Sequence, residues 1–241
     1  MERPSWAPEA IDIDRPSPAR IYDYHLGGTH NFPADRVAAQ AITAKFPLTP
    51  AIARTGRAFL RRAVRHVAAK GVRQFLDLGS GIPTVGNVHE IAQAADRDAR
   101  VVYVDMDPVA VAHSHAILAD NDNATAVHAD LRDVAEVLDS AQTRRLIDFS
   151  RPVGLLMVAV LQFVPDRDDP AGVVARYRDA LVPGSHLVIS QAAAAEDGHI
   201  PQGGAEAAAT YSSRVTELTL RTRAQVAEMF SGFELIDPGI V

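Results

Sequence analysis

The sequence contains no cysteine, which excludes disulfide bonds, thiolate metal sites and a cysteine nucleophile. It also has no apolar run near the roughly 18 residues that a membrane span needs. Residues 1–18 are rich in proline and charge and lack the apolar segment of a secretion signal. We therefore expect a cytoplasmic protein with no membrane partner, in which residues 1–18 form a flexible tail.

Basic residues are in the minority, with 24 Lys and Arg against 30 Asp and Glu. The net charge of −6 disfavours a general surface for nucleic acid, so we expect no nucleic-acid partner. Arg61, Arg62, Arg65 and His66 form a local basic run, which is more typical of a solvated helix face. The hydrophobic content of 47% is enough to bury the core of one α/β domain.

Two patterns of phosphate-binding loops are missing. The sequence has no Gly-Lys-Ser/Thr, and in GSGIPTVG the third glycine, Gly86, comes two residues too late for Gly-x-Gly-x-x-Gly. What is present is an apolar run, FLDL, that carries Asp77 and ends in a turn with Gly79 and Gly81. Such a turn lets a nucleotide-like ligand approach the backbone, and a purely structural turn is an equally good interpretation of these residues alone.

A second acid ends the next expected strand. Residues 100–104 read RVVYV, and Asp105 follows them roughly 20 or more residues beyond the glycine turn. A carboxylate at this point of a βαβ unit accepts hydrogen bonds from ribose hydroxyls. A nicotinamide cofactor and an adenosyl cofactor both remain open on this evidence.

Hydrophobic periodicity predicts helices that precede a sheet, and then strands that alternate with helices. The expected N-terminal helices cover residues 19–26, 33–45 and 49–70. Strands are expected near 73–78, 100–105, 124–129, 153–160 and 185–191, with a sixth at 233–236. The other helices are expected near 85–95, 108–120, 131–140, 170–182 and 223–230. This alternation predicts an α/β fold with a doubly wound, mostly parallel sheet, which binds its ligand across the carboxyl ends of the first and fourth strands.

The segments DLGSGIP and VVYVDMDP resemble motifs one and two of class I S-adenosylmethionine-dependent methyltransferases. With ARIYDYHLGGTHNFPADR, HADLRD and RTRAQVAEMFSGFELIDPGIV, the chain from Ala19 onward resembles an actinobacterial S-adenosyl methyltransferase family. The resemblance implies a Rossmann-like fold, S-adenosyl-L-methionine as cofactor, and a single domain over residues 19–241. Within that domain it implies a helical lid or extension over residues 19–71 and a core over residues 72–241.

The resemblance also implies which residues bind the cofactor. The glycine turn and the acid before it would surround the methionine and ribose portions, and Asp105 would bind the ribose hydroxyls. Met106 would pack on adenine, with filling of the core as the alternative. Asp130 would accept a hydrogen bond from the adenine amino group, cap a helix beginning at Leu131, or do both. The full set is Asp77, Gly79, Ser80, Gly81, Asp105, Met106, Asp130, Leu131 and Val160.

The expected acceptor site lies beyond the fourth strand. Many similar small-molecule methyltransferases carry histidine where this chain has Gln162, and glutamine cannot act as a general base. The segment YDYHLGGTHNF is interpreted as a lid over the cofactor, or alternatively as a packed helix with surface histidines. The substrate-pocket candidates are Tyr22, Tyr24, His30, Asn31 and Gln162, and no catalytic residue is assigned.

No metal site is expected. Asp166, Asp168 and Asp169 follow the fourth strand, and we interpret this charge run as capping the next helix in preference to binding a metal ion. His113 and His115 are two residues apart on an expected helix, and they therefore point to different faces.

The resulting hypothesis is methyl transfer to an oxygen or nitrogen atom of a small molecule. The Asn/Asp-Pro-Pro-Tyr/Phe signature of nucleobase or glutamine methylation is absent from the fourth strand. Two alternatives stay open: a noncatalytic S-adenosylmethionine-binding or regulatory protein, and an NAD-dependent oxidoreductase. The resemblance further implies a last, antiparallel strand after GFELIDPGIV, whose absence would leave a sheet edge exposed and allow homo-oligomers.

Overall fold

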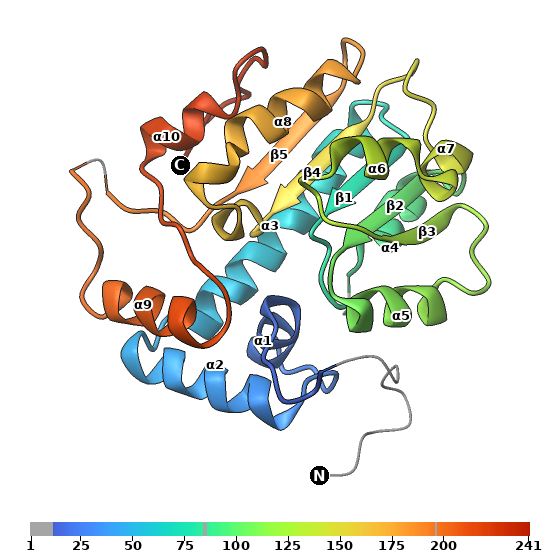
Figure 1. The fold of residues 1–241 in the computed structure, drawn as a ribbon. Helices are drawn as coiled ribbons and strands as arrows, with labels where there is room; N and C mark the ends of the chain where they lie inside the picture. The colour runs from blue at the N-terminus through green and yellow to red at the C-terminus, as the bar shows by residue number, and fades with distance from the viewer. Residues whose placement is uncertain (1–11, 84–85, 196) are drawn as a thin grey trace.

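A computed structural model describes residues 12–83, 86–195 and 197–241 of the chain. Its centre is a five-stranded parallel sheet with the strand order β3-β2-β1-β4-β5 (Figure 1). The strands are β1 (Gln74–Leu78), β2 (Arg100–Asp105), β3 (Ala124–His128), β4 (Gly154–Val158) and β5 (His186–Ser190). The order reverses between β1 and β4, so the carboxyl ends of these two strands border the crevice where open α/β sheets bind ligands.

Helices cover both faces of the sheet, as predicted for a doubly wound fold (Figure 1). One face packs against α3 (Thr49–Ala69), α4 (Val88–Ala95) and α5 (Pro108–Ile117). The opposite face packs against α6 (Val134–Asp139), α7 (Ala141–Leu146), α8 (Pro170–Asp179) and α10 (Arg223–Glu228). Because both faces are covered, the strands are apolar along most of their length. Within the described ranges, no helix combines the length and apolar composition needed to cross a lipid bilayer.

The alternation of side chains along β1 decides where its acid points. Phe75 packs in the core beneath α3 and α4, whereas Leu76 and Leu78 pack in the core of the opposite face. Side chains two residues apart share a face of a strand, so Asp77 faces the α3 side together with Phe75. An acid of β1 therefore points toward the helix that precedes it in the sequence.

A helical layer lies beside the carboxyl edge of the sheet. It consists of α1 (Pro18–His25), α2 (Pro33–Lys45) and α9 (Gly204–Arg214). Figure 1 shows α9 beside α2, although the two helices are far apart in the sequence. Proline opens both α1 and α2, at a position where its missing N–H removes no helix hydrogen bond. Ile21, Ala39, Ile42 and Ala207 are buried together in a small core within this layer.

A buried arginine joins this layer to the sheet. Nε of Arg20 in α1 lies 3.4 Å from Oδ1 of Asp35 in α2 and 3.5 Å from Oδ2 of Asp107. Asp107 caps α5 by accepting from the N–H of Val109, and it also accepts a hydrogen bond from the Ser17 hydroxyl. One buried cation with two carboxylate partners therefore connects α1, α2 and the start of α5.

The structure differs from the sequence analysis near the C-terminus. Residues 233–236 form no strand, so the predicted sixth strand is wrong. A strand needs a partner for its backbone hydrogen bonds, and within the described residues this segment pairs with none. Leu235 and Ile236 are accordingly exposed. Helices α7 and α9 are also not predicted from the sequence, because α7 is short and two glycines stand at the start of α9.

Candidate functional site

The turn after β1 holds two glycines in left-handed backbone conformations, with φ of 70° at Gly79 and 67° at Gly81. The N–H groups of Gly79 and Ser80 donate to the carbonyl oxygen of Val104 at 2.8 and 3.1 Å, which ties the turn to β2. A Cβ atom at Gly79 would lie 2.2 Å from the side chain of Val160, whereas one at Gly81 would meet no atom of the described residues within 4 Å. Gly79 is therefore required by packing, and Gly81 faces open space that a ligand can occupy.

Asp105 ends β2 beside this turn. Its Oδ2 accepts a 2.7 Å hydrogen bond from the N–H of Gly81, and its Oδ1 accepts a 2.8 Å bond from the N–H of Asp107. Burial raises the pKa of Asp105 to about 6, and the backbone donors of Asp107 and Gly81 limit the rise. The carboxylate is thus held in one orientation, and its remaining lone pairs are available to hydroxyl donors.

Asp77 lies on β1, two residues before Gly79, and only 5% of it is exposed. Burial raises the pKa of Asp77 to about 7; the Arg57 guanidinium on α3 opposes this rise, and the nearby Asp105 carboxyl adds to it. The acid therefore ionises close to neutral pH. A cationic group bound beside it would stabilise its charged form.

The loop after β4 begins with strained backbone. Ala159 has a φ of 58°, a left-handed conformation that residues with a Cβ atom adopt rarely. Its N–H donates to the carbonyl oxygen and the hydroxyl of Ser190, each at 3.0 Å. The next residue, Val160, packs against Gly79, so the β1 turn and the β4 loop form adjoining walls of one site.

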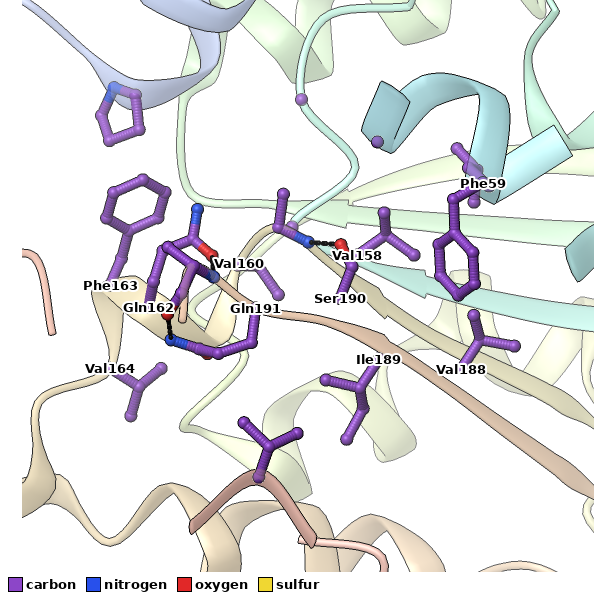
Figure 2. A pocket seen from close by; sticks show the side chains of 18 of the residues that line it. Phe59, Val158, Val160, Gln162, Phe163, Val164, Val188, Ile189, Ser190 and Gln191 are labelled. Carbon is purple, nitrogen blue, oxygen red and sulfur yellow. Dashed lines mark hydrogen bonds between the residues drawn. The ribbon is translucent and has the colours of Figure 1, made fainter. Parts of the chain in front are cut away.

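Gln162 lies in the 3₁₀ turn that follows, Leu161–Phe163. Its Oε1 accepts a 3.2 Å hydrogen bond from the N–H of Ala192, just after β5, and this contact sets the orientation of the amide (Figure 2). The amide nitrogen Nε2 is the end left for the cavity, and it can only donate. Gln162 is therefore a hydrogen-bond donor in this site and not a base.

A continuous cavity of about 2520 Å³ connects these elements. The cavity also extends along β5 to residues 183–186 and to the C-terminal segment, so only part of this volume lies at the carboxyl ends of β1, β2 and β4. Beyond Gln162 the wall is aromatic, because Phe163 stacks on Tyr211 of α9 with ring centroids 5.4 Å apart. The predicted site residues that line the cavity are Tyr22, Asp77, Gly79, Ser80, Gly81, Asp105, Met106, Asp130, Leu131, Val160 and Gln162.

Three predicted pocket residues are not part of the cavity lining. The Asn31 side chain is buried and held by hydrogen bonds within its own segment. The Tyr24 hydroxyl accepts a hydrogen bond from α2, and the ring of His30 packs on that of His113 with centroids 3.9 Å apart. These contacts give Tyr24, His30 and Asn31 roles in packing the N-terminal segment, whereas Tyr22 lines the cavity.

The structure also decides two alternatives left open by the sequence. Met106 is 65% exposed, so it does not fill the core. Helix α6 begins at Val134, so Asp130 does not cap a helix beginning at Leu131. The Asp130 carboxylate instead pairs with the guanidinium of Arg132. Burial raises the pKa of Asp130, but the contacts with Arg132 together outweigh burial and lower it overall. Any contact of Asp130 with a ligand is therefore shared with this ion pair.

The acidic run after β4 has structural partners. Asp169 accepts a hydrogen bond from the first turn of α8 and caps that helix, which confirms the capping interpretation for this residue. Asp166 pairs with the buried Arg221, and Asp168 pairs with Arg132. In the part of the chain that the structure describes, no group of three or more histidine or acidic side chains is placed to hold a metal ion.

Arg57 of α3 lines the same cavity, and it is not among the site residues predicted from the sequence. Its guanidinium carbon lies 5.8 Å from the ring centroid of Tyr22, whose hydroxyl donates to the carbonyl oxygen of Ala53 at 2.8 Å. Nε of Arg57 is buried and has no hydrogen-bond partner among the described residues. Arg57 belongs to an arginine-rich segment, RTGRAFLRR, and only the fold distinguishes it from the arginines on the solvated side of the helix.

Comparison with known proteins identifies the family to which this chain belongs. A family model described as S-adenosyl methyltransferase matches residues 4–241. The chain belongs to this family. It is thus an S-adenosylmethionine-dependent methyltransferase, and the predicted enzyme class, fold class and cofactor are confirmed. Membership decides against an NAD-dependent oxidoreductase.

Two solved structures share the fold over nearly the whole chain. A candidate methyltransferase from Thermobifida fusca YX is 40% identical with a TM-score of 0.91, over 98% of this chain and 87% of that one. A DUF574 family protein from Streptomyces avermitilis MA-4680 is 41% identical with a TM-score of 0.90, over 95% and 88%. An O-methyltransferase family protein from Burkholderia thailandensis, 13% identical with a TM-score of 0.53 over 83% and 53%, shares the fold alone. Curated proteins gave no significant match.

The residues present fit the family's cofactor. Gly81 faces open space beside the oriented carboxylate of Asp105, which suits a ribose. Met106 presents an exposed thioether chain that can cover a flat ring. The carboxyl of Asp77 and the unsatisfied Nε of Arg57 line the same cavity.

Proposed function

We propose that the protein transfers the methyl group of S-adenosyl-L-methionine to an oxygen or nitrogen atom of a small molecule held beyond the carboxyl end of β4. The observation that carries the proposal is the Gln162 amide, which Ala192 orients so that its Nε2 is left for the cavity. A donor at this point suits an acceptor molecule that presents an oxygen or nitrogen lone pair. The Phe163–Tyr211 wall favours an apolar or aromatic body for that molecule.

The donor, in this proposal, occupies the space between the glycine turn and the end of β2. Asp105 accepts from the ribose hydroxyls, and Met106 packs on the adenine ring. Asp130 and Leu131 border the adenine amino group, and the β1 turn contacts the methionine portion. What supports this arrangement is that all the proposed residues line one cavity: Asp77, Gly79, Ser80, Gly81, Asp105, Met106, Asp130, Leu131 and Val160.

S-Adenosyl-L-methionine supplies a methyl group that its positive sulfur already activates. The residues of this chain therefore have to bind, align and shield the reactants, and alignment alone contributes much of the rate. Gln162 holds the acceptor through Nε2 and takes no proton near neutral pH. The acceptor accordingly binds already ionised, or the methylated product loses its proton to bulk solvent after it leaves the site. We propose that the helical extension over residues 19–71, with Tyr22 at the cavity wall, covers the site and excludes water.

The test is turnover with small-molecule acceptors. The protein is incubated with S-adenosyl-L-methionine and panels of phenols, carboxylic acids and amines, and mass spectrometry detects S-adenosylhomocysteine and the methylated product. Gln162→Leu should lower turnover of any acceptor found while leaving the affinity for S-adenosylhomocysteine unchanged. Methylation confined to proteins or nucleic acids would contradict the proposal. Cofactor binding without turnover of any acceptor would favour a noncatalytic binding protein.

A further inference from the structure

Arg57 has hydrogen-bonding capacity that nothing in the described chain uses. Its Nε is buried without a partner, and among the described residues its guanidinium forms no ion pair within 4.0 Å. Taking a guanidinium partly out of water is unfavourable unless an anion or other acceptor compensates for the lost hydration. The contact with the face of Tyr22 compensates for only part of that loss. An anionic ligand would supply the rest.

The position of Arg57 is set by its surroundings. The Tyr22 ring beneath the guanidinium is anchored by its hydroxyl, which donates to the carbonyl oxygen of Ala53 on α3. Gly56, the residue before Arg57, allows this approach, because a Cβ there would lie 3.3 Å from the Tyr22 hydroxyl. Two contacts between α1 and α3 therefore hold the guanidinium at the cavity wall.

An acid shares this cavity with Arg57. Asp77 faces the α3 side of the sheet and lines the same cavity. The guanidinium opposes the rise that burial causes in the pKa of Asp77, and the two groups form no ion pair within 4.0 Å. Opposite charges held apart in one cavity fit a ligand that carries both charges. An α-amino acid group is such a ligand, with an ammonium for the carboxylate and a carboxylate for the guanidinium.

We infer that Arg57 binds the carboxylate of the donor's amino-acid end, while Asp77 takes its ammonium group. The inference rests on the proposed function, because the donor is the ligand that carries this group. Tyr22 acts as a positioning residue for Arg57. Helix α3, which precedes the sheet, thereby contributes directly to donor binding in addition to covering the sheet.

The test uses three ligands that differ only in the amino-acid end. Isothermal titration calorimetry compares S-adenosylhomocysteine, its decarboxylated form, and 5′-methylthioadenosine, which lacks the whole amino-acid end. The unaltered protein should bind S-adenosylhomocysteine about 10- to 100-fold more tightly than the decarboxylated form, as expected for a charge-assisted hydrogen bond. Arg57→Met should abolish this ratio and leave the affinity for 5′-methylthioadenosine unchanged. The matched control is Arg54→Met, which removes an exposed arginine of the same helix outside the cavity.

The outcomes separate this inference from the proposed function. Equal affinity of the unaltered protein for S-adenosylhomocysteine and its decarboxylated form would overturn the inference, and this comparison needs no folded variant. A ratio that survives in Arg57→Met would overturn it as well. Arg57→Lys keeps the charge without the planar fork and should retain part of the ratio. Failure of the unaltered protein to bind any of the three ligands would instead reject the proposed function.

Discussion

The backbone N–H of Gly81 donates a 2.7 Å hydrogen bond to Oδ2 of Asp105. The glycine turn after β1 and the acid that ends β2 are thus connected within the protein itself. A second backbone donor, from Asp107, orients the other carboxylate oxygen. A carboxylate held in this way loses little further side-chain freedom when it binds hydroxyl groups, which favours tight binding of a ribose.

The first prediction concerns the charge of Asp105. Asp105→Asn keeps the shape of the side chain but loses the charged acceptor proposed for the ribose. The affinity for S-adenosylhomocysteine should fall about 10- to 100-fold, because hydrogen bonds to charged groups are the stronger class. Calorimetry measures this, with Asp139→Asn as a control in an exposed ion pair. An Asp105→Asn variant that binds as tightly as the control would exclude the ribose role.

Alanine substitutions at the two turn glycines should lower stability for different reasons. Gly79→Ala combines left-handed strain with a clash against Val160 and should lower the free energy of unfolding by about 2–5 kcal/mol. Gly81→Ala has the strain without the clash and should lose about 1–2 kcal/mol, but its methyl group enters the space proposed for the donor. Urea unfolding and calorimetry separate the two effects.

Val160→Ala tests the clash directly. It should restore only part of the stability lost in Gly79→Ala, because it removes the γ carbon that would lie 2.2 Å from the added methyl group but keeps the Cβ atom, which would lie 2.6 Å from it. In the Gly81→Ala background it should restore nothing. Equal recovery in both backgrounds would show that the contact between Gly79 and Val160 does not limit the turn.

The titration of Asp77 and Asp105 should make a contribution to the stability of the ligand-free protein that falls as the pH rises toward neutrality. Burial raises the pKa of Asp77 to about 7 and that of Asp105 to about 6, from an ordinary value of 3.8. Between these values the two carboxyl groups bind more protons in the folded state than in the unfolded state, so their contribution to the free energy of unfolding decreases with increasing pH. Asp77→Asn should flatten this decline in urea unfolding measured from about pH 4 to pH 7. A variant with the same slope would show that Asp77 does not titrate in this range.

Donor binding should show the opposite pH dependence. The contacts proposed for Asp77 and Asp105 need ionised carboxylates, so the affinity for S-adenosylhomocysteine should increase as the pH rises through about 6 to 7. Binding should also release protons, which calorimetry in buffers of different ionisation enthalpy detects. Affinity that is constant or falls over this range would contradict both contacts.

Arg20 should be essential for stability. Arg20→Met leaves the carboxylates of Asp35 and Asp107 buried without their cation, which should lower the free energy of unfolding by about 3–5 kcal/mol. Lys45→Met is the control, because its pair with Glu206 is exposed and should contribute about 1 kcal/mol or less. Chemical denaturation of both variants gives the comparison. Similar small losses in the two would show that the buried network does not hold the N-terminal layer in place.

Local sequence was sufficient to predict the strands of the sheet and the starts of several helices. Strand β2 spans residues 100–105 in the structure, as the apolar run predicts, because a strand buried on both faces must be apolar throughout. Pro33 and Pro170 mark helix starts for an equally local reason, since proline is favoured in the first turn. The glycine turn and Asp105 could be predicted from the sequence for the same reason, because each lies at the end of a strand.

Contacts between segments far apart in the sequence could not be predicted from local sequence. An arginine on an amphipathic helix looks the same whether it faces water or a cavity, so Arg57 could not be singled out before α3 was packed beside Asp77. The orientation of the Gln162 amide depends on Ala192, which only the pairing of β4 with β5 brings near. Residues 233–236 have strand-like composition but find no partner in the sheet. Hydrophobic periodicity indicates which side chains of a segment are buried. Which residues they contact depends on how the whole chain packs.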